Sequence, residues 1–369
     1  MTRLLRLAEE FGQSPWLDNL RRSYLTSGEL ATMRDRGVRG LTSNPTIFQK
    51  SITGSDDYDA QFASLVDDPD TPVADTYWDL VIADIHGACD VFDVTYEGTD
   101  ALDGYVSVEV DPGLAHDTEG TERSARELHE RIARRNLMVK IPATEAGLPA
   151  IRSMIAEGRN INVTLIFSLD RYAAVIEAYL SGLEERAADP DADLSRIASV
   201  ASFFISRTDT EVDRRLEAIG TPEALELRGR AAVTQGRLAY RLFREAFSGP
   251  RWDALAARGA RVQRPLWAST GTKNDAYSDV LYVDELIGPD TVNTLPEDTL
   301  EAFDDHGTLA RTVDADPAEA DRVWAALADV GIDTDDVAAR LESEGVDSFQ
   351  KSFDELISAL DAKADDLRR

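Results

Sequence analysis

The feature that most limits the possible folds of this chain is a repeated alternation of short apolar runs with longer helical patterns. Eight runs have the length and apolar content of buried strands. They cover residues 14–18, 38–44, 105–110, 136–141, 161–167, 199–205, 265–270 and 291–295. Strands that alternate with helices favour a parallel sheet, because each crossover between parallel strands needs a helix-sized segment.

Three of the intervening segments carry helix-end signals. Ser168 is an expected N-cap, and one face of the following helix is apolar, with Tyr172, Val175, Ile176 and Tyr179 at helical spacing. Ser27 is the expected N-cap of an earlier helix that stops at Gly37. Thr71 is a third expected N-cap, with Pro72 at the first helical position.

Eight strand–helix repeats indicate a (β/α)8 TIM barrel, whose usual size is about 250 residues. An open doubly wound sheet is the alternative, but no G-x-G-x-x-G or G-x-x-x-x-G-K-[ST] turn is present. We therefore expect a barrel catalytic domain over residues 1–307. Residues 308–369 are expected to form a helical extension packed on the barrel, with helices over 317–331, 334–345 and 347–367.

Composition excludes several classes of partner. The net charge of −30 disfavours binding to nucleic acid or an anionic membrane surface. The acidity has two readings, a solvated surface or adaptation to high salt, and it disfavours self-association at low salt, so a monomer or homodimer is expected. A single cysteine, Cys89, excludes an internal disulfide framework. No transmembrane run or signal peptide is recognised, which favours the cytoplasm.

Polar residues stand where most of the predicted strands end. Barrel enzymes build their active sites at the carboxyl-terminal ends of the strands. In chain order, the polar residues carried by these strands or just after them are Asp18, Asn44, Glu109, Lys140, Asn162, Thr164, Ser202, Arg207, Ser269 and Lys273.

Each of these residues alone has a structural explanation. Asp18 and Asn44 could be helix N-caps, Glu109 and Lys140 could form a buried ion pair, and Arg207 could begin a solvated helix. Seven successive strand ends with polar groups favour an active site over seven separate structural roles.

Lys140 is the nucleophile that this set of residues offers. The four histidines, His86, His116, His129 and His306, fall in helical or loop stretches, so a Ser-His-Asp triad and a multi-histidine metal site are not expected. Burial disfavours the charged form of a lysine, and a neutral amine can attack a ketone to give an imine. The imine lets a neighbouring C–C bond break. Asp18 and Glu109 are available for the proton transfers that this chemistry needs.

Six segments closely resemble the signature segments of transaldolases, the Schiff-base enzymes of the pentose phosphate pathway. They are LTSNPTIF, VSVEVDP, NLMVKIPAT, INVTLIFS, SFFISRTD and WASTGTKN, and the similarity runs in order from about residue 14 to 300. The resemblance implies a (β/α)8 barrel that transfers a dihydroxyacetone unit without a cofactor or metal. The donor would be sedoheptulose 7-phosphate or fructose 6-phosphate, and the acceptor glyceraldehyde 3-phosphate or erythrose 4-phosphate.

The resemblance also implies a role for each residue that matches a motif. Lys140 would form the imine, and Asp18 would be the acid/base for C–C cleavage. Glu109 and Thr164 would position the water of imine formation and hydrolysis. The remaining matches would bind substrate: Asn44, Asn162 and Ser202 the dihydroxyacetone hydroxyls, and Arg207, Ser269 and Lys273 the phosphate. Lys273 departs from the commonest family pattern, a shorter turn ending in arginine, and offers a point charge without a bidentate fork.

Two functional alternatives share the same residues. A class I aldolase would use the imine but release free dihydroxyacetone. Phe204, two residues after Ser202 on the same strand face, could form a dry wall that favours transfer instead. A non-catalytic sugar-phosphate binder would bind substrate without forming an imine.

Overall fold

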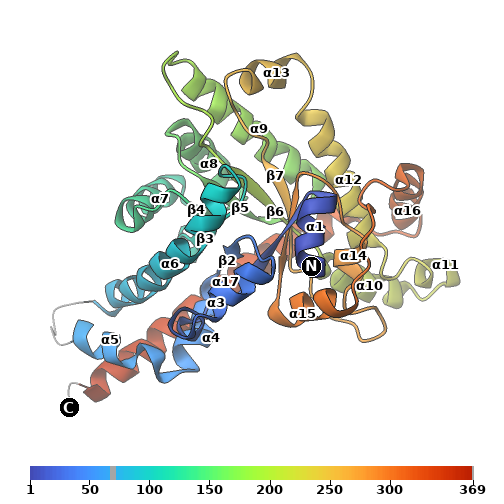
Figure 1. Ribbon diagram of the computed structural model, residues 1–369. Coiled ribbons are helices and arrows are strands. Elements are labelled where there is room, and N and C mark those ends of the chain that lie inside the picture. The colour runs from blue at the N-terminus through green and yellow to red at the C-terminus, as the bar shows by residue number, and fades with distance from the viewer. Residues whose placement is uncertain (67–71, 368–369) are drawn as a thin grey trace.

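The computed structural model describes residues 1–66 and 72–367, and in this part of the chain eight parallel strands close into a barrel (Figure 1). The strands are β1 Gln13–Asp18, β2 Leu41–Thr42, β3 Val106–Glu109, β4 Leu137–Pro142, β5 Ile161–Ile166, β6 Ser199–Phe204, β7 Arg264–Ala268 and β8 Thr291–Leu295. Each pairs with its neighbour in sequence, and β1 pairs with β8. All eight predicted strands and the (β/α)8 fold are confirmed, although β2 is reduced to two residues.

Helices follow the strands and cover the outside of the barrel (Figure 1). They are α1 Arg3–Phe11, α2 Arg22–Ser27, α3 Glu29–Arg36, α4 Pro45–Thr53, α5 Asp59–Leu65, α6 Val73–Gly98, α7 Thr118–Ile132, α8 Gly147–Ala156, α9 Leu169–Ala187, α10 Ser206–Ile219, α11 Pro222–Leu225, α12 Ala231–Ala246, α13 Pro250–Ala256, α14 Leu281–Asp284, α15 Glu297–His306, α16 Pro317–Asp329 and α17 Thr334–Leu367, with short 3-10 turns at η1 Asp56–Tyr58 and η2 Pro112–Leu114. In the described residues, no helix is long and apolar enough to cross a membrane.

The helix-end predictions have mixed outcomes. Ser168 caps α9 by accepting a hydrogen bond from the Arg171 N–H, as expected. Ser27 is not an N-cap, because α2 extends to it and Gly28, with φ 80°, is the N-cap of α3. Pro72 stands at the cap of α6 and not at its first helical position. Thr71 lies outside the described residues.

Strand register places three of the predicted site residues at one level of the barrel. Glu109 of β3 lies beside Lys140 of β4, and Lys140 lies beside Asn162 of β5. All three side chains are buried. The parallel pairing therefore brings together residues that are 53 positions apart in sequence.

A bulge interrupts the pairing of β5 with β6 directly after Thr164. Val163 pairs with Ala201 and Ile166 with Phe203, so one extra residue stands on β5. Leu165 accommodates it with φ 60°, a left-handed conformation that is uncommon for a residue with a branched side chain. Bulges of this kind turn side chains in new directions and are frequent beside active sites.

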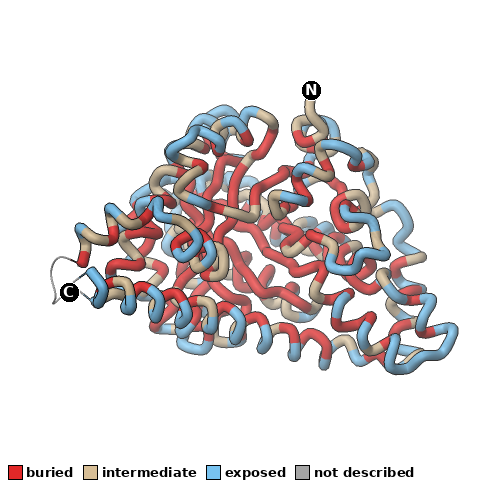
Figure 2. The backbone as a smooth tube through the Cα atoms, turned by 90° about the horizontal axis from the view of Figure 1, so that it is seen from below, coloured by how far each residue is buried: buried red, intermediate tan, exposed pale blue. Residues whose placement is uncertain are grey.

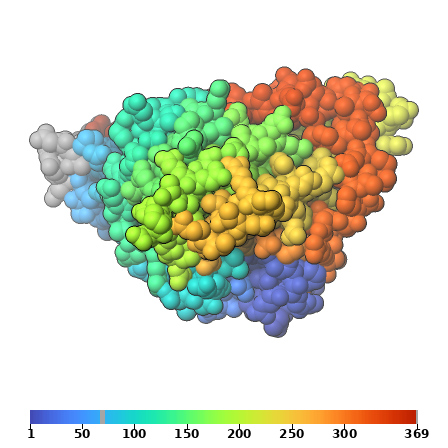
Figure 3. Space-filling view, turned by 90° about the horizontal axis from the view of Figure 1, so that it is seen from above, coloured from blue at the N-terminus to red at the C-terminus, as the bar shows by residue number. Residues whose placement is uncertain are grey.

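A buried ion pair fills the opposite end of the barrel. Arg264, at the start of β7, donates to Asp103 at 3.1 Å and to the Ser14 hydroxyl at 2.5 Å. Asp103 also accepts from Ser14 at 2.7 Å. The side chains of Asp103 and Arg264 are 1% and 7% exposed. Figure 3 shows this side of the molecule, where α13 and the connection from α9 to β6 cover the centre.

In the described part of the chain, two helices follow α15, and not the three that were expected. α17 runs unbroken through Gly345, where the sequence predicted a break, and is buried along one face (Figure 2). It contacts α10, β5, η2, α4 and α6, so it extends beside the carboxyl-terminal ends of the strands. The boundary between residues 307 and 308 stays a prediction.

Candidate active site

A small cavity lies at the carboxyl-terminal ends of the strands. Its volume is about 80 Å3, below the roughly 300 Å3 of a pocket that encloses a whole ligand. The lining residues are Asp18, Thr42, Asn44, Lys140, Thr164, Ser202, Phe204, Arg207, Ala268, Ser269, Thr294 and Phe349.

Lys140 is the buried ammonium group of this cavity. The residue is 4% exposed, and its Nζ lies 3.1 Å from Glu109 Oε2. Nζ also donates a hydrogen bond of 2.9 Å to the carbonyl oxygen of Ser43. The ion pair that was a structural alternative is therefore present, and it places a carboxylate within proton-transfer distance of the amine.

Two opposing effects act on the pKa of each carboxylate near Lys140. Burial raises the pKa of Glu109 and of Asp18, and the charge of Lys140 acts against this in each case. Asp18 Oδ1 accepts a 2.8 Å hydrogen bond from Thr42, whose hydroxyl also lies 2.6 Å from that of Thr294. Asp18 is no helix cap, since α2 begins at Arg22.

Amide and hydroxyl groups line the wall next to Lys140. Ser202 donates to Asn162 Oδ1 at 2.7 Å, and Asn162 donates to Ser107 Oγ at 3.0 Å. Asn162 is thus positioned behind Ser202 rather than at the cavity surface. Asn44 lines the cavity and also caps α4, with Oδ1 accepting from the Ile47 N–H. Asn44 therefore has the structural role of a helix cap in addition to its place in the cavity wall.

Thr164 contributes a buried hydroxyl that has no hydrogen-bond partner within the described residues. Leaving a buried hydroxyl unpaired costs free energy, about 1–3 kcal/mol. An unpaired donor that faces the Lys140 cavity is therefore suited to binding a water molecule or a substrate oxygen.

Arg207 is the cation at the outer side of the cavity. Its guanidinium carbon lies 5.2 Å from the centre of the Phe204 ring, and it makes no hydrogen bond or ion pair within residues 1–66 and 72–367. Burial lowers its pKa, while Asp18, Glu109 and Glu344 raise it. Ser269 has a left-handed backbone conformation with φ 55°. Its hydroxyl lies 3.0 Å from that of Ser206, the first residue of α10. A half-buried, unpaired guanidinium beside hydroxyl groups is suited to an anion.

Lys273 does not join the other candidates. It is exposed, and it does not line the cavity that contains Lys140. Its charge still reaches Asp18, whose pKa it helps to lower. The structure therefore places Lys273 at the rim.

Two tyrosine–carboxylate pairs fasten the segment after Lys273 to α10. Tyr282 donates to Asp209 Oδ2 at 2.9 Å, and Tyr277 donates to Asp213 Oδ2 at 2.6 Å. Asp209 also accepts from the Ala232 N–H at 2.7 Å. Asp209 is buried, and its desolvation raises its pKa to about 7.

We expect the contribution of Asp209 to the free energy of unfolding to fall as pH rises. An unfolded aspartate titrates near pH 3.9, so the stabilising contribution of the protonated form is complete below pH 4 and is lost as pH rises to about 7. In D209N this change should be missing. Urea denaturation at pH 5 and pH 8 should show that the wild type loses more unfolding free energy than D209N. Equal losses would contradict the buried carboxyl's raised pKa.

The sequence missed several lining residues. Thr42 and Thr294 lie on strands that were predicted, and Thr42 is two positions from Asn44 in the predicted strand 38–44, so alternation could have indicated it. Ala268 carries no polar signal. Phe349 comes from α17, and helical periodicity shows that such a residue is buried without showing what it packs against.

Comparison with known proteins agrees with this geometry. The sequence pattern of the Transaldolase/Fructose-6-phosphate aldolase family matches residues 15–360. The transaldolase of Mycobacterium ulcerans is 51% identical over 97% of this chain and 96% of its own length. That of Acidothermus cellulolyticus is also 51% identical, over 97% of this chain and 96% of its own. A match of this extent shows that the chain belongs to the transaldolase/fructose-6-phosphate aldolase family of enzymes.

Proposed function

We propose that this enzyme transfers a dihydroxyacetone unit from a ketose phosphate to an aldose phosphate, with Lys140 as the nucleophile. The observation that carries the proposal is the buried Lys140–Glu109 pair at 3.1 Å. Lys140 lines the cavity, and Asp18 lines it as well. The donor would be sedoheptulose 7-phosphate or fructose 6-phosphate, and the acceptor glyceraldehyde 3-phosphate or erythrose 4-phosphate.

The first half of the reaction would form and use the imine. Lys140 Nζ transfers its proton toward Glu109 and attacks the C2 carbonyl of the donor. Loss of water from the carbinolamine gives the imine, with Glu109 and the unpaired hydroxyl of Thr164 holding that water. Asp18 then takes the proton of the C4 hydroxyl. The C3–C4 bond breaks and the aldose phosphate leaves. The electron pair of that bond remains on the three-carbon fragment, which is now an enamine on Lys140.

The second half would reverse these steps on a new aldehyde. The enamine carbon attacks the acceptor carbonyl, and Asp18 returns its proton to the new hydroxyl. Asn44 and Ser202 would bind the hydroxyls of the dihydroxyacetone unit, with Asn162 behind Ser202. Arg207 and Ser269 would bind the phosphate, and Lys273 would contribute from the rim.

Two observations weigh on the alternatives. The relatives compared above are transaldolases along nearly their whole length, which favours transfer over release of free dihydroxyacetone. The Lys140, Glu109 and Asp18 set is intact, which disfavours a non-catalytic binder. A cytoplasmic monomer or homodimer remains our proposal, supported by the net charge of −30 and the single buried cysteine.

Borohydride trapping with fructose 6-phosphate tests the proposal. In the wild type, reduction should leave a three-carbon adduct on Lys140. In D18N the imine should still form but the C–C bond should not break, so a six-carbon phosphate adduct should accumulate and turnover should fall by roughly 10^2- to 10^4-fold. Peptide mass spectrometry distinguishes the two adducts by mass.

Two results would contradict the mechanism. A wild-type enzyme that binds the sugar without any adduct would be a binder. A three-carbon adduct on D18N at the wild-type rate would remove Asp18 from the cleavage step.

A further inference from the structure

One wall of the cavity comes from a helix far along the chain. Phe349 of α17 lines the same cavity as Lys140 and is 4% exposed. It belongs to a buried stripe of α17 at helical spacing, which also contains Leu341, Gly345 and Phe353. It packs in one apolar cluster with Leu165, Phe167 and Phe204. Of these four residues, Phe204 and Phe349 reach the cavity.

The close approach of α17 depends on local geometry on both sides. The bulge at Leu165 brings that side chain against the helix. A Cβ atom on Gly345 would lie 3.0 Å from Leu165 Cδ2 and 3.6 Å from Arg207 Nη1. Glycine therefore lets the helix backbone lie against Leu165, near the end of β5, and against Arg207 in the first turn of α10. The next turn of the helix then places the Phe349 ring at the cavity.

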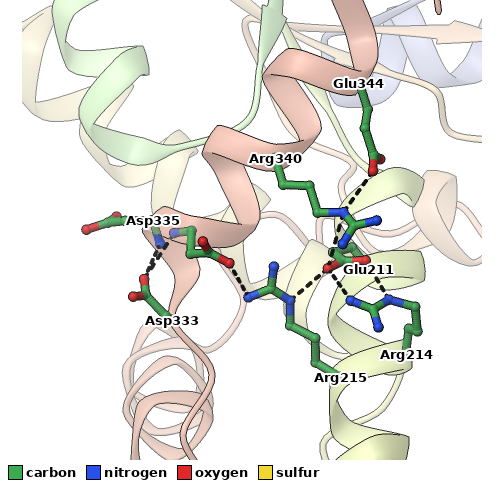
Figure 4. Close-up of polar contacts among 8 residues, drawn as sticks. Glu211, Arg214, Arg215, Asp333, Asp335, Arg340 and Glu344 are labelled. Carbon is green, nitrogen blue, oxygen red and sulfur yellow. Dashed lines mark hydrogen bonds and ion pairs between the residues drawn. The ribbon is translucent and has the colours of Figure 1, made fainter.

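An ion-pair network fastens one part of α17 to α10 (Figure 4). Glu211 accepts from Arg214 and Arg215, and Arg215 also pairs with Asp336 of α17 at 2.7 Å. Arg340 of α17 pairs with Glu344 at 2.8 Å and lies 3.7 Å from Glu211. The hydrogen bond from Arg214 lowers the pKa of Glu211 to about 2, so the network is charged at neutral pH.

The other side of Phe349 is fastened as well. The hydroxyls of Thr46 in α4 and Ser352 lie 2.8 Å apart. Phe353, one turn beyond Phe349, packs edge to face on Tyr77 of α6 at 5.2 Å. Helix α17 is thus fastened on both sides of Phe349, which suits a wall better than a gate.

We propose that Phe349 keeps water and bulk protons away from the enamine on Lys140, and so sets how often that intermediate is transferred rather than released. This rests on the proposed function. In the release branch, water protonates the enamine carbon, and hydrolysis of the resulting imine returns free dihydroxyacetone and the Lys140 amine. In the transfer branch, the same carbon forms its new bond to the acceptor aldehyde. A dry wall slows only the first branch.

The test compares F349A with F353A. Both changes remove a buried phenyl ring from α17, so both should lower the melting temperature by a comparable amount. Each enzyme receives fructose 6-phosphate with erythrose 4-phosphate, and free dihydroxyacetone and sedoheptulose 7-phosphate are both measured. F349A should raise the ratio of released to transferred product about tenfold or more, and F353A should leave it at the wild-type value. F349L, which keeps an apolar side chain, should fall between them and serves if F349A does not fold.

The outcomes separate the two proposals. A release-to-transfer ratio in F349A and F349L equal to that of the wild type would overturn the role of Phe349 while leaving the transferase in place. An equal rise in F353A would show that loosening of α17, and not the Phe349 ring, admits water. A wild type that forms neither product would overturn the proposed function itself.

Discussion

Lys140→Arg should abolish transfer, lowering turnover by more than roughly 10^4-fold, the scale seen when a covalent nucleophile is removed. Arginine keeps a positive charge beside Glu109, so the buried ion pair is preserved. Its guanidinium cannot form an imine with a ketone under these conditions. The variant therefore separates the chemical role of the lysine from its electrostatic one. A coupled assay of glyceraldehyde 3-phosphate release measures the loss.

The control for this variant is K351R. Lys351 lies on α17 with 77% of its side chain exposed, and the same exchange there should leave activity unchanged. The melting temperature of K140R should stay within a few degrees of the wild type. Near wild-type turnover in K140R would make the imine assignment wrong.

Asp103→Ala should lower the free energy of unfolding by about 3–5 kcal/mol. The carboxylate is 1% exposed and is bound by Arg264 and Ser14. Its removal leaves the Arg264 guanidinium buried without its countercharge, which is the costly way to break a buried ion pair. Urea unfolding followed by circular dichroism measures the change.

A surface pair provides the comparison. Asp90 and Arg134 lie 2.9 Å apart, with 63% and 39% of their side chains exposed. Asp90→Ala should cost less than about 1 kcal/mol, because solvent screens exposed pairs. Folded D103A should keep its activity, since Asp103 lies at the barrel end opposite Lys140. Equal losses in the two variants would show that burial does not decide the effect.

The sequence was informative where a local pattern determines the structure. Most strands are short apolar runs, and polar residues stand on or just after most of them. The barrel rule then gathers Asp18, Lys140, Thr164 and Ser202 without knowledge of any distance. The resemblance to transaldolases also identified these residues.

What the sequence could not show depends on packing between distant segments. Glycine is a poor helix former, so Gly345 predicted a break. The helix continues because glycine is what fits against Leu165 and Arg207 there. The bulge at Leu165 depends on how β5 pairs with β6, and the rim position of Lys273 depends on a turn whose path no periodicity describes.

The pairing of β1 with β8 has a consequence for the order in which the enzyme is made. Gln13 of β1 and Thr291 of β8 are hydrogen-bonded to each other and are 278 residues apart in sequence. The ribosome must therefore synthesise all eight strands before β1 can pair with β8. Phe349 emerges later still. Lys140 is therefore synthesised before β8 closes the barrel and before α17 supplies Phe349 to the wall of its cavity.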